Sequence, residues 1–316
     1  AAINPTVGDL AGNSAEAVRA VAAAAQEGAH LVVFPEMVLT GYPVEDLALR
    51  SSFRQASKKA IAALATELAD KGHGDLVAVV GYLDEAPSGG PQNVAAVIHG
   101  GHVKARYVKT HLPNFGVFDE YRNFVAGDST LVVRIHGVDV GVLICQDIWH
   151  PDGVLAQLAA RSPGLVVVPN GSPFERNKDD VRLALVSKEA VRMDTPFVYV
   201  NMVGGQDDLV FDGDSMVVDR DGALLARTPH CDEGLMIVDL DCDGLTSSPD
   251  VIISEDAIAQ STPIVTAIAE RTSIEEEIWK VLVTGLRDYV EKNGFKSVVL
   301  GLSGGIDSAL VAAIAV

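Results

Sequence analysis

The chain has 316 residues, of which 48% are hydrophobic and 21% are charged, as in packed globular proteins rather than disordered ones. This length suffices for one large α/β domain or two ordinary ones. The formal net charge of −19 argues against a general nucleic-acid-binding surface, although a local basic pocket could still hold a nucleotide. We expect no membrane span, because no apolar stretch reaches the roughly 18 residues required, and no signal peptide, because the first residues lack a basic segment.

The cysteine content predicts a reducing environment. The three cysteines, Cys145, Cys231 and Cys242, are too few and too scattered for a disulfide framework or a Cys-x-x-Cys metal site. We therefore expect a cytoplasmic protein, and we expect no metal among the functional residues of the first 240 positions.

The predicted elements of the first 240 residues are mainly strands. A capping box at residues 13–16 opens an alanine-rich helix that is expected to end at Gly28, and a short buried strand follows at 31–34. Further helices are predicted over 52–71, 154–160 and 180–194. Further strands are predicted over 76–83, 93–98, 102–108, 131–135, 138–144, 165–168, 197–201, 215–219, 223–227 and 235–240. Because strands outnumber helices and βαβ units are mixed with hairpins, we predict two stacked sheets with helices outside, a four-layer αββα sandwich.

The composition changes after this region. Residues 242–272 are rich in Asp, Ser and Pro, with only a weak helical pattern around 255–259, and are predicted to be a linker. A second capping box at 273–276 opens an amphipathic helix, and a strand over 297–302, a glycine-containing loop and the start of another helix follow. We therefore expect a domain at 1–241, a linker at 242–272, and the beginning of a doubly wound α/β nucleotide-binding domain at 273–316.

Four predicted strands of the first domain end at a reactive or polar residue: Glu36, Lys109, Cys145, and the stretch 170–178. Each has an ordinary explanation when taken singly. A buried cysteine commonly packs as a small hydrophobic residue, Glu36 could cap the next turn, and Lys109 could be an exposed strand end. Together they form a more informative set, because active sites of α/β proteins commonly lie where strands end.

A carboxylate, an ammonium and a thiol can hydrolyse an amide without a histidine. The thiolate is the nucleophile, and a nearby ammonium lowers the pKa of the thiol. The same ammonium stabilises the oxyanion that forms on the attacked carbonyl. The carboxylate takes the thiol proton and later activates water. The sequence therefore favours an amide hydrolase built from Glu36, Lys109 and Cys145.

Three segments in this order resemble the signature blocks of the nitrilase, or carbon–nitrogen hydrolase, superfamily. They are Phe-Pro-Glu at 34–36, Lys109 with the stretch to Glu120, and Ile-Cys-Gln-Asp-Ile-Trp at 144–149. The resemblance covers about residues 1–240. It implies the αββα sandwich, with Glu36 as general base, Lys109 as oxyanion stabiliser and Cys145 as nucleophile. It also implies a supporting role for Glu120 and an oxyanion-hole contact from the backbone N–H of Gln146.

A second motif lies near the end of the chain. Ser-Gly-Gly-Ile-Asp-Ser at 303–308 stands between a predicted strand and a helix start, where backbone N–H groups can approach an anion. The string resembles the pyrophosphate loop of the N-type ATP pyrophosphatases. The resemblance implies binding of ATP, with Mg²⁺, by Ser303, Gly304, Gly305, Asp307 and Ser308.

The order of the two units resembles the glutamine-dependent NAD synthetases. The resemblance implies that glutamine, ATP and deamido-NAD are substrates, that the glutaminase step needs no cofactor, and that the protein is a homo-oligomer without nucleic-acid or membrane partners. A glutamine pocket must hold an α-carboxylate and an α-ammonium. Arg176 suits the carboxylate, and Tyr42, Phe118 and Ser172 are candidate wall or hydrogen-bonding residues. Alanine is the expected residue where this chain has Gly171.

Two other functions remain compatible with part of this pattern. A free-standing carbon–nitrogen hydrolase acting on a small amide would share Glu36, Lys109 and Cys145 but would have no use for the loop at 303–308. A non-catalytic α/β assembly or regulatory module would not need the three reactive residues.

Overall fold

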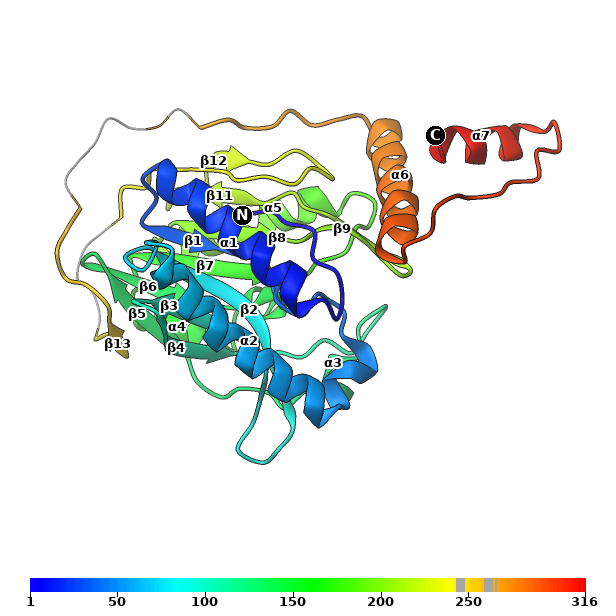
Figure 1. Ribbon diagram of the computed structural model, residues 1–316. Coiled ribbons are helices and arrows are strands. Elements are labelled where there is room, and N and C mark those ends of the chain that lie inside the picture. Colours follow the sequence, from blue (N-terminus) through cyan, green and yellow to red (C-terminus); the bar gives the residue numbers. More distant parts are fainter. Residues whose placement is uncertain (243–247, 259–263, 265) are drawn as a thin grey trace.

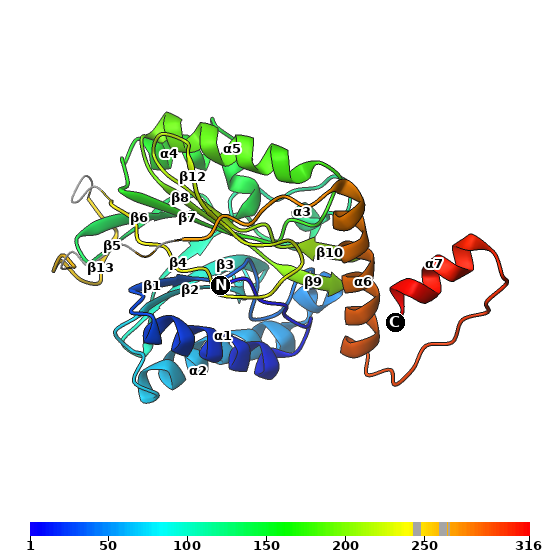
Figure 2. The ribbon, with the colours of Figure 1, turned by 90° about the horizontal axis from the view of Figure 1, so that it is seen from above.

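The computed structural model describes residues 1–242, 248–258, 264 and 266–316. Two β-sheets lie face to face, and helices cover their outer faces (Figures 1 and 2). In Figure 2, α1 and α2 lie on one side of the sheets while α4 and α5 lie on the other. The predicted αββα sandwich is confirmed. None of the helices in these ranges is both long and apolar enough to cross a membrane.

The first sheet has the strand order β1-β2-β3-β4. Its strands are β1 (Leu31–Val33), β2 (Val77–Glu85), β3 (Pro91–His99) and β4 (His102–Val108). β1 is parallel to β2, and the remaining pairs are antiparallel. The outer face is covered by α1 (Leu10–Gln26) and α2 (Ser51–Asp70).

The second sheet has the strand order β12-β11-β8-β7-β6-β5-β13. Its strands are β5 (Leu131–Ile135), β6 (Val138–Val142), β7 (Leu165–Asn170), β8 (Phe197–Asn201), β11 (Met216–Val218), β12 (Leu224–Arg227) and β13 (Val251–Ile252). The parallel strands β6, β7 and β8 are connected through α4 (Val154–Ala159) and α5 (Lys178–Met193). A separate hairpin consists of β9 (Val203–Gln206) and β10 (Leu209–Asp212).

Side chains of the first sheet alternate between two hydrophobic cores, one on each face of the sheet. Val77 and Val79 belong to the core between the two sheets, whereas Ala78 and Val80 belong to the core beneath α1 and α2. Successive side chains of a strand point to opposite faces, so a strand covered on both sides is apolar throughout. Burying each such side chain contributes about 2 kcal/mol, which fixes the strands that carry the site at their ends.

The first helix begins earlier than predicted. Asp9 is its N-cap, and the Asp9 carboxylate accepts a hydrogen bond from the N–H of Gly12 at 2.9 Å. Asn13, expected at the cap, lies inside the helix and is buried. Its side-chain amide donates to the carbonyls of Thr6 and Leu39 instead. Asp9 and Asn13 are both residues that commonly cap helices. Asn13 uses its side chain for the contacts with Thr6 and Leu39, and Asp9 is the N-cap.

Two predicted strands are absent from the described parts of the chain. Residues 235–240 form no strand, and Leu235 and Ile237 pack against the core beneath α1 and α2 instead. Residues 297–302 form none either, and Val299 is 98% exposed. A strand needs a neighbouring strand for its backbone hydrogen bonds, so apolar composition alone does not produce one. The β9–β10 hairpin was missed because the Gly204-Gly205 pair is typical of a turn.

The predicted linker contributes to the second sheet. Residues 243–247, 259–263 and 265 of this segment lie outside the described residues, and so does part of the weak helical pattern at 255–259. In the described part, 255–258 are not helical, and β13 pairs in parallel with β5. The N–H of Arg227 also bonds to the carbonyl of Ala267. The described parts of the segment therefore contact the second sheet at β5 and β12, and β13 adds an edge strand to it.

The C-terminal part contains α6 (Ile274–Lys292) and α7 (Ile306–Ile314). The predicted cap is confirmed, because the Ser273 hydroxyl accepts from the N–H of Glu276 at 3.2 Å. α6 packs against the β9–β10 hairpin, and α7 lies beyond it (Figure 1). Asp288 of α6 accepts from the N–H of Gly205 at 2.7 Å, and Lys292 donates to the carbonyl of Gly205 at 2.8 Å.

Candidate active site

The ends of several strands bring ionisable side chains together between the two sheets. Glu36 follows β1, Lys109 follows β4, and Glu120 begins the short helix α3 (Glu120–Asn123). The Lys109 ammonium lies 2.6 Å from Glu36 Oε1 and 2.7 Å from Glu120 Oε2. All three side chains are buried. The cluster holds two carboxylates around one ammonium, so it carries a negative charge when all are ionised.

Glu36 is fixed by donors on both of its oxygens. Oε1 accepts from Lys109 and also from the side-chain amide of Asn93 at 2.7 Å. Oε2 accepts from the backbone N–H of Gly171 at 2.8 Å. The carboxylate therefore has a single orientation, with β3, the end of β4 and the end of β7 each supplying a contact. Such preorganisation suits a group that must accept and return a proton.

Glu120 is held differently. The hydroxyl of Tyr42 donates to its Oε1 at 2.8 Å, and Lys109 contacts its other oxygen. Burial raises the pKa of Glu120 to about 7, with the charge of Lys109 opposing the shift and that of Glu36 adding to it. Burial lowers the pKa of Lys109, but the two carboxylates outweigh this and raise it overall. Lys109 is therefore a permanent cation in the site.

Cys145 follows β6 and opens the 3₁₀ helix η2 (Cys145–Trp149). Its backbone is left-handed, with φ of 45°, a conformation that is strained for a residue other than glycine and is typical of functional positions. Burial and the charge of Glu36 raise the pKa of the thiol, whereas Lys109 and a backbone hydrogen bond from Gly171 lower it. The net shift is upward, so the lowering effect of the Lys109 ammonium, which the sequence predicts, is outweighed by burial and Glu36.

Gln146 is the second residue of η2, directly after Cys145. The N–H groups of the first turn of a helix have no partner within the helix, so they are available to an anion. This places the predicted oxyanion donor next to Cys145 in the chain, and its role stays a prediction.

The residues predicted to bind glutamine are placed unequally. Tyr42 and Ser172 are buried beside the cluster, and their hydroxyls contact Glu120 and Arg182 respectively. Phe118 is half-buried, and its ring lies 5.6 Å from that of Phe115. Arg176 is exposed in the turn before α5, and its guanidinium has no ion pair within the described ranges.

Gly171 occupies the position where alanine was expected. A Cβ added there would lie 3.0 Å from Cδ1 of Tyr42 and 3.3 Å from Oε2 of Glu36. Both distances are shorter than ordinary van der Waals contact. Glycine at this position allows the Tyr42 ring and the Glu36 carboxylate to approach the backbone closely, and the N–H of Gly171 donates to Glu36.

Arg182 supports this loop and was not predicted from the sequence. It is fully buried in α5, and its Nη1 contacts both carboxylate oxygens of Asp212, at 2.9 and 2.8 Å. Its Nη2 donates to the carbonyls of Ser172 at 2.8 Å and Pro173 at 3.0 Å. An arginine on an amphipathic helix usually faces solvent, so its helical register with buried Val186 was the only signal for burial.

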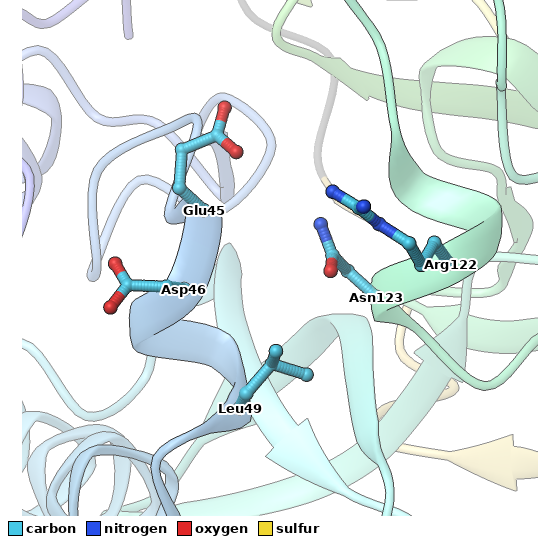
Figure 3. A pocket seen from close by; sticks show the side chains of 5 residues that line it. All are labelled: Glu45, Asp46, Leu49, Arg122 and Asn123. Atoms are coloured by element: carbon cyan, nitrogen blue, oxygen red, sulfur yellow. The ribbon is translucent and has the colours of Figure 1, made fainter.

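A cavity of about 430 Å³ is lined in part by Arg122 and Asn123, which follow Glu120 in the sequence (Figure 3). It is formed between the 3₁₀ helix η1 (Glu45–Leu49) and α3. Its lining residues are Glu45, Asp46, Leu49, Arg122 and Asn123. The lining includes none of Glu36, Lys109, Glu120 and Cys145, so the cavity does not contain the reactive cluster.

One group of side chains has the composition of a metal site. Atoms of Asp212, His230 and Glu277 lie within 4.8 Å of one another. Arg182 already occupies both oxygens of Asp212. Burial lowers the pKa of His230, but Asp214, Asp212 and Glu277 outweigh it and raise the pKa overall, which favours an imidazolium that cannot bind a metal. The group is therefore an ion-pair network that joins α6 to the loop beside the reactive cluster.

Residues 303–305 precede α7 and residues 306–308 form its first turn, and 303–307 are exposed. The hydroxyls of Ser303 and Ser308 lie 3.0 Å apart, and the hydroxyl of Ser308 also donates to the carbonyl of Gly305. Gly304 has φ of 86°, which favours glycine. Asp307 stands in the first turn of α7. The predicted helix start is present, although the predicted strand before the loop is not.

Two family models match the chain. One, described as carbon-nitrogen hydrolase, matches residues 1–250, and the other, described as NAD synthase, matches residues 278–316. A glutamine-dependent NAD(+) synthetase of Thermotoga maritima is 39% identical over 336 residues, which cover 100% of this chain and 57% of that protein. One of Rhodobacter capsulatus is 42% identical over 316 residues, which cover 100% of this chain and 53% of that protein. The chain spans about half the length of the curated relatives it matches.

Solved structures show the same two-part similarity. A glutamine-dependent NAD+ synthetase from Acinetobacter baumannii, in complex with ADP, has a TM-score of 0.88 and 37% identity, with 100% of this chain and 56% of that chain covered. An amidase from Nesterenkonia sp. AN1, modified by acrylamide at its active-site cysteine, has a TM-score of 0.67 and 26% identity, with 76% of this chain and 91% of that chain covered. With the model match over residues 1–250, the chain belongs to the carbon-nitrogen hydrolase family.

Proposed function

We propose that this chain is the glutamine-hydrolysing part of a glutamine-dependent NAD synthetase, joined to the start of its ATP-binding unit. The observation that carries the proposal is the buried cluster of Glu36, Lys109 and Glu120 beside Cys145, in a chain that also contains the loop at 303–308. The similarity to glutamine-dependent NAD synthetases along the whole chain supports it. The proposed division is a glutaminase domain at 1–241, a linker at 242–272 and the synthetase unit from 273.

In the proposed first half-reaction, the Cys145 sulfur attacks the side-chain carbonyl carbon of glutamine while Glu36 takes the thiol proton. The resulting oxyanion is stabilised by the Lys109 ammonium and the N–H of Gln146. Collapse of the tetrahedral intermediate breaks the carbon–nitrogen bond, and Glu36 returns the proton to the nitrogen. Ammonia leaves, and a γ-glutamyl thioester remains on Cys145.

In the second half-reaction, Glu36 takes a proton from water, and the oxygen attacks the thioester. Lys109 again stabilises the oxyanion, glutamate leaves, and the sulfur regains the proton. Glu120 shares Lys109 with Glu36, and we propose that this keeps the ammonium fixed at the oxyanion position throughout. The raised pKa of Cys145 makes the proton transfer to Glu36 a required step rather than an optional one.

We propose a glutamine pocket formed by residues that lie close to the reactive cluster, together with Arg176. Tyr42 and Ser172 have hydroxyls that are already bonded within the protein, so they would shape the wall, and Phe118 would form its apolar side. Arg176 has a guanidinium that is free of protein partners in the described ranges and remains the proposed partner of the α-carboxylate.

The ammonia would be used at the second unit, where ATP adenylates deamido-NAD and ammonia then displaces AMP to give NAD, with pyrophosphate released earlier. The N–H groups of the loop at the start of α7, with Ser303 and Ser308, suit phosphate oxygens. Asp307 offers a carboxylate oxygen of the kind Mg²⁺ prefers. We further propose a cytoplasmic homo-oligomer.

The test is to give the purified protein, carrying its complete synthetase unit, glutamine with and without ATP and deamido-NAD, and to follow ammonia, glutamate and NAD. The proposal expects NAD formation that requires all three substrates. Hydrolysis of small amides without preference for glutamine would favour a free-standing amidase instead. Inertness with an unreactive Cys145 would favour a non-catalytic module.

A further inference from the structure

Asp147 is a fully buried carboxylate two residues after Cys145, in η2. Its Oδ2 accepts from the hydroxyl of Tyr107 at 2.7 Å and from the N–H of Ile144 at 3.1 Å. Its Oδ1 accepts from the N–H of His111 at 2.8 Å and the N–H of Thr110 at 3.2 Å. The His111 ring nitrogen Nδ1 lies 3.1 Å from the same oxygen. The carboxylate thus has donors on both oxygens.

These donors come from two separate segments of the site. Tyr107 precedes Lys109 in the chain, and Thr110 and His111 follow it. Ile144 precedes the nucleophile, and the N–H of Asp147 bonds back to the Ile144 carbonyl at 3.0 Å. One carboxylate therefore joins the turn that carries the thiol to the segment that carries the ammonium.

A second contact joins the same two segments. The rings of His111 and His150 are stacked, with centroids 4.2 Å apart and planes 10° apart. His150 ends η2, so this 3₁₀ helix is attached to the 109–111 segment at both its middle and its end. Gly153 leaves room for this arrangement, because a Cβ there would lie 2.3 Å from the His111 ring.

Each oxygen of the Asp147 carboxylate accepts from protein donors, so its orientation is fixed. Buried polar groups are stable when they are hydrogen-bonded in this way. Burial, and then the charge of Asp147, raise the pKa of Tyr107, so this hydroxyl stays a donor. The left-handed backbone at Cys145 also has to be maintained, and the Ile144 contacts close that turn.

We propose that Asp147 is a positioning residue that sets the orientation of the Cys145 thiol relative to the Lys109 ammonium. It touches neither substrate nor reacting atoms and acts through the two residues it connects. The proposal goes beyond the proposed glutaminase activity, because it concerns the reactivity of Cys145 whatever amide is hydrolysed. The positioning role of Asp147 and the glutaminase activity can therefore be refuted independently of each other.

The sign of one measurement separates positioning from simple electrostatics. If the connection is loosened, the ammonium acts less strongly on the thiol, and the pKa of Cys145 rises further. Removing a nearby negative charge without movement would instead lower the pKa of Cys145. An upward shift on neutralising Asp147 can therefore come only from lost positioning.

The experiment measures alkylation of Cys145 by iodoacetamide as a function of pH, with mass spectrometry of the Cys145 peptide and Cys231 as an internal reference. Asp147→Asn keeps the size but turns one oxygen into a donor that faces donors. We expect alkylation near neutral pH to slow by about tenfold, the effect of one pKa unit, and kcat for glutamine to fall more than KM changes. The matched control is Asp139→Asn, since Asp139 is also fully buried, accepts from Arg134 at 2.9 Å and lies in β6.

Two further variants keep the proposal open to refutation if Asp147→Asn folds poorly. Tyr107→Phe removes one donor and leaves the carboxylate, and should give a smaller shift in the same direction. In a Lys109→Met background, Asp147→Asn should add no further shift, because the ammonium it positions is gone. An unchanged or lowered alkylation pKa in both Asp147→Asn and Tyr107→Phe, or a full additional shift without Lys109, would overturn the proposal.

Discussion

Cys145 is acted on in opposite directions by its surroundings. Burial and Glu36 raise the pKa of the thiol, while Lys109 and the N–H of Gly171 lower it. The upward net shift fits the proposed role of Glu36 as the base that takes the thiol proton, and the pKa of Cys145 depends on both charged partners. This dependence can be measured at each partner separately.

Lys109→Met is expected to slow alkylation of Cys145 near neutral pH. The substitution removes the cation that lowers the pKa of the thiol and leaves Glu36 and Glu120 without a counter-charge. One pKa unit reduces the thiolate fraction about tenfold, and we expect at least that. Lys188→Met is the control, because Lys188 is 69% exposed and distant in the chain. Unchanged alkylation in Lys109→Met would remove Lys109 from its assigned role.

Gly171→Ala is expected to reduce activity more than stability. The new Cβ would lie 3.0 Å from the Tyr42 ring and 3.3 Å from Glu36, so these groups or the loop must shift by a few tenths of an ångström, which weakens the hydrogen bond from the Gly171 N–H to Glu36. Overpacking of this kind costs about 1–3 kcal/mol, measurable by denaturant unfolding. Gly234→Ala is the control, because a Cβ there meets nothing within 4 Å. Full glutaminase activity in Gly171→Ala would show that the contact between Gly171 and Glu36 is dispensable.

The reactive residues could be predicted from the sequence more readily than their supports. Glu36, Lys109 and Cys145 each follow an apolar strand, and that pattern is visible without coordinates. Asp147 and Arg182 have no such signal, because their importance comes from partners distant in the chain, such as Asp212 for Arg182. Spacing along a sequence does not reveal which charged side chains become buried.

At the scale of elements, α6 is fixed to the β9–β10 hairpin by buried polar contacts. Asp288 and Lys292 bond to Gly205, and Asn4 bonds to both of them. His230 lies 3.3 Å from Glu277 of α6 and 3.5 Å from Asp214. A charged network therefore connects the start of the second unit with the hairpin whose last residue, Asp212, holds Arg182.

Stability is expected to fall as pH rises, because of His230. Its pKa is raised by Asp214, Asp212 and Glu277 above the ordinary value of 6.5, despite burial. A histidine that binds its proton more tightly when folded stabilises the protein fully below pH 6.5, and this contribution is lost as pH rises through the folded pKa. Burial also raises the pKa of Glu277, which acts in the same direction.

The measurement is the free energy of unfolding between pH 6 and pH 9, by denaturant titration. His230→Gln should flatten the decline, since Gln does not titrate. His73→Gln, in the turn after α2, is the control and should leave the decline intact. An equally steep decline in His230→Gln would show that other groups cause it.

The sequence predicts helices and strands well where each element shows its own hydrophobic periodicity and a short connection leads to the next element. β7, β8 and α5 follow one another with short connections, and their periodicity was sufficient. The β9–β10 hairpin and residues 297–302 show the opposite case, because pairing decides the strand state there. Gly205 pairs with Val210 of β10, and no partner strand exists for 297–302 within the described residues.

The whole molecule combines a densely packed sandwich with a more exposed C-terminal part. Figure 1 shows α6 beside β9 and α7 beyond it. Ile306, at the start of α7, is 84% exposed, whereas the strands of both sheets carry buried valines. The family matches divide in the same places, at residues 1–250 and 278–316. We therefore propose that the chemistry of the whole molecule is divided between two units.

The most direct test is NAD formation by Cys145→Ala in a chain that carries the complete synthetase unit, with either glutamine or ammonium chloride as the nitrogen source. The account predicts that synthesis from glutamine is abolished while synthesis from ammonia continues at the unmodified rate. Loss of both activities together, or persistence of synthesis from glutamine, would contradict it.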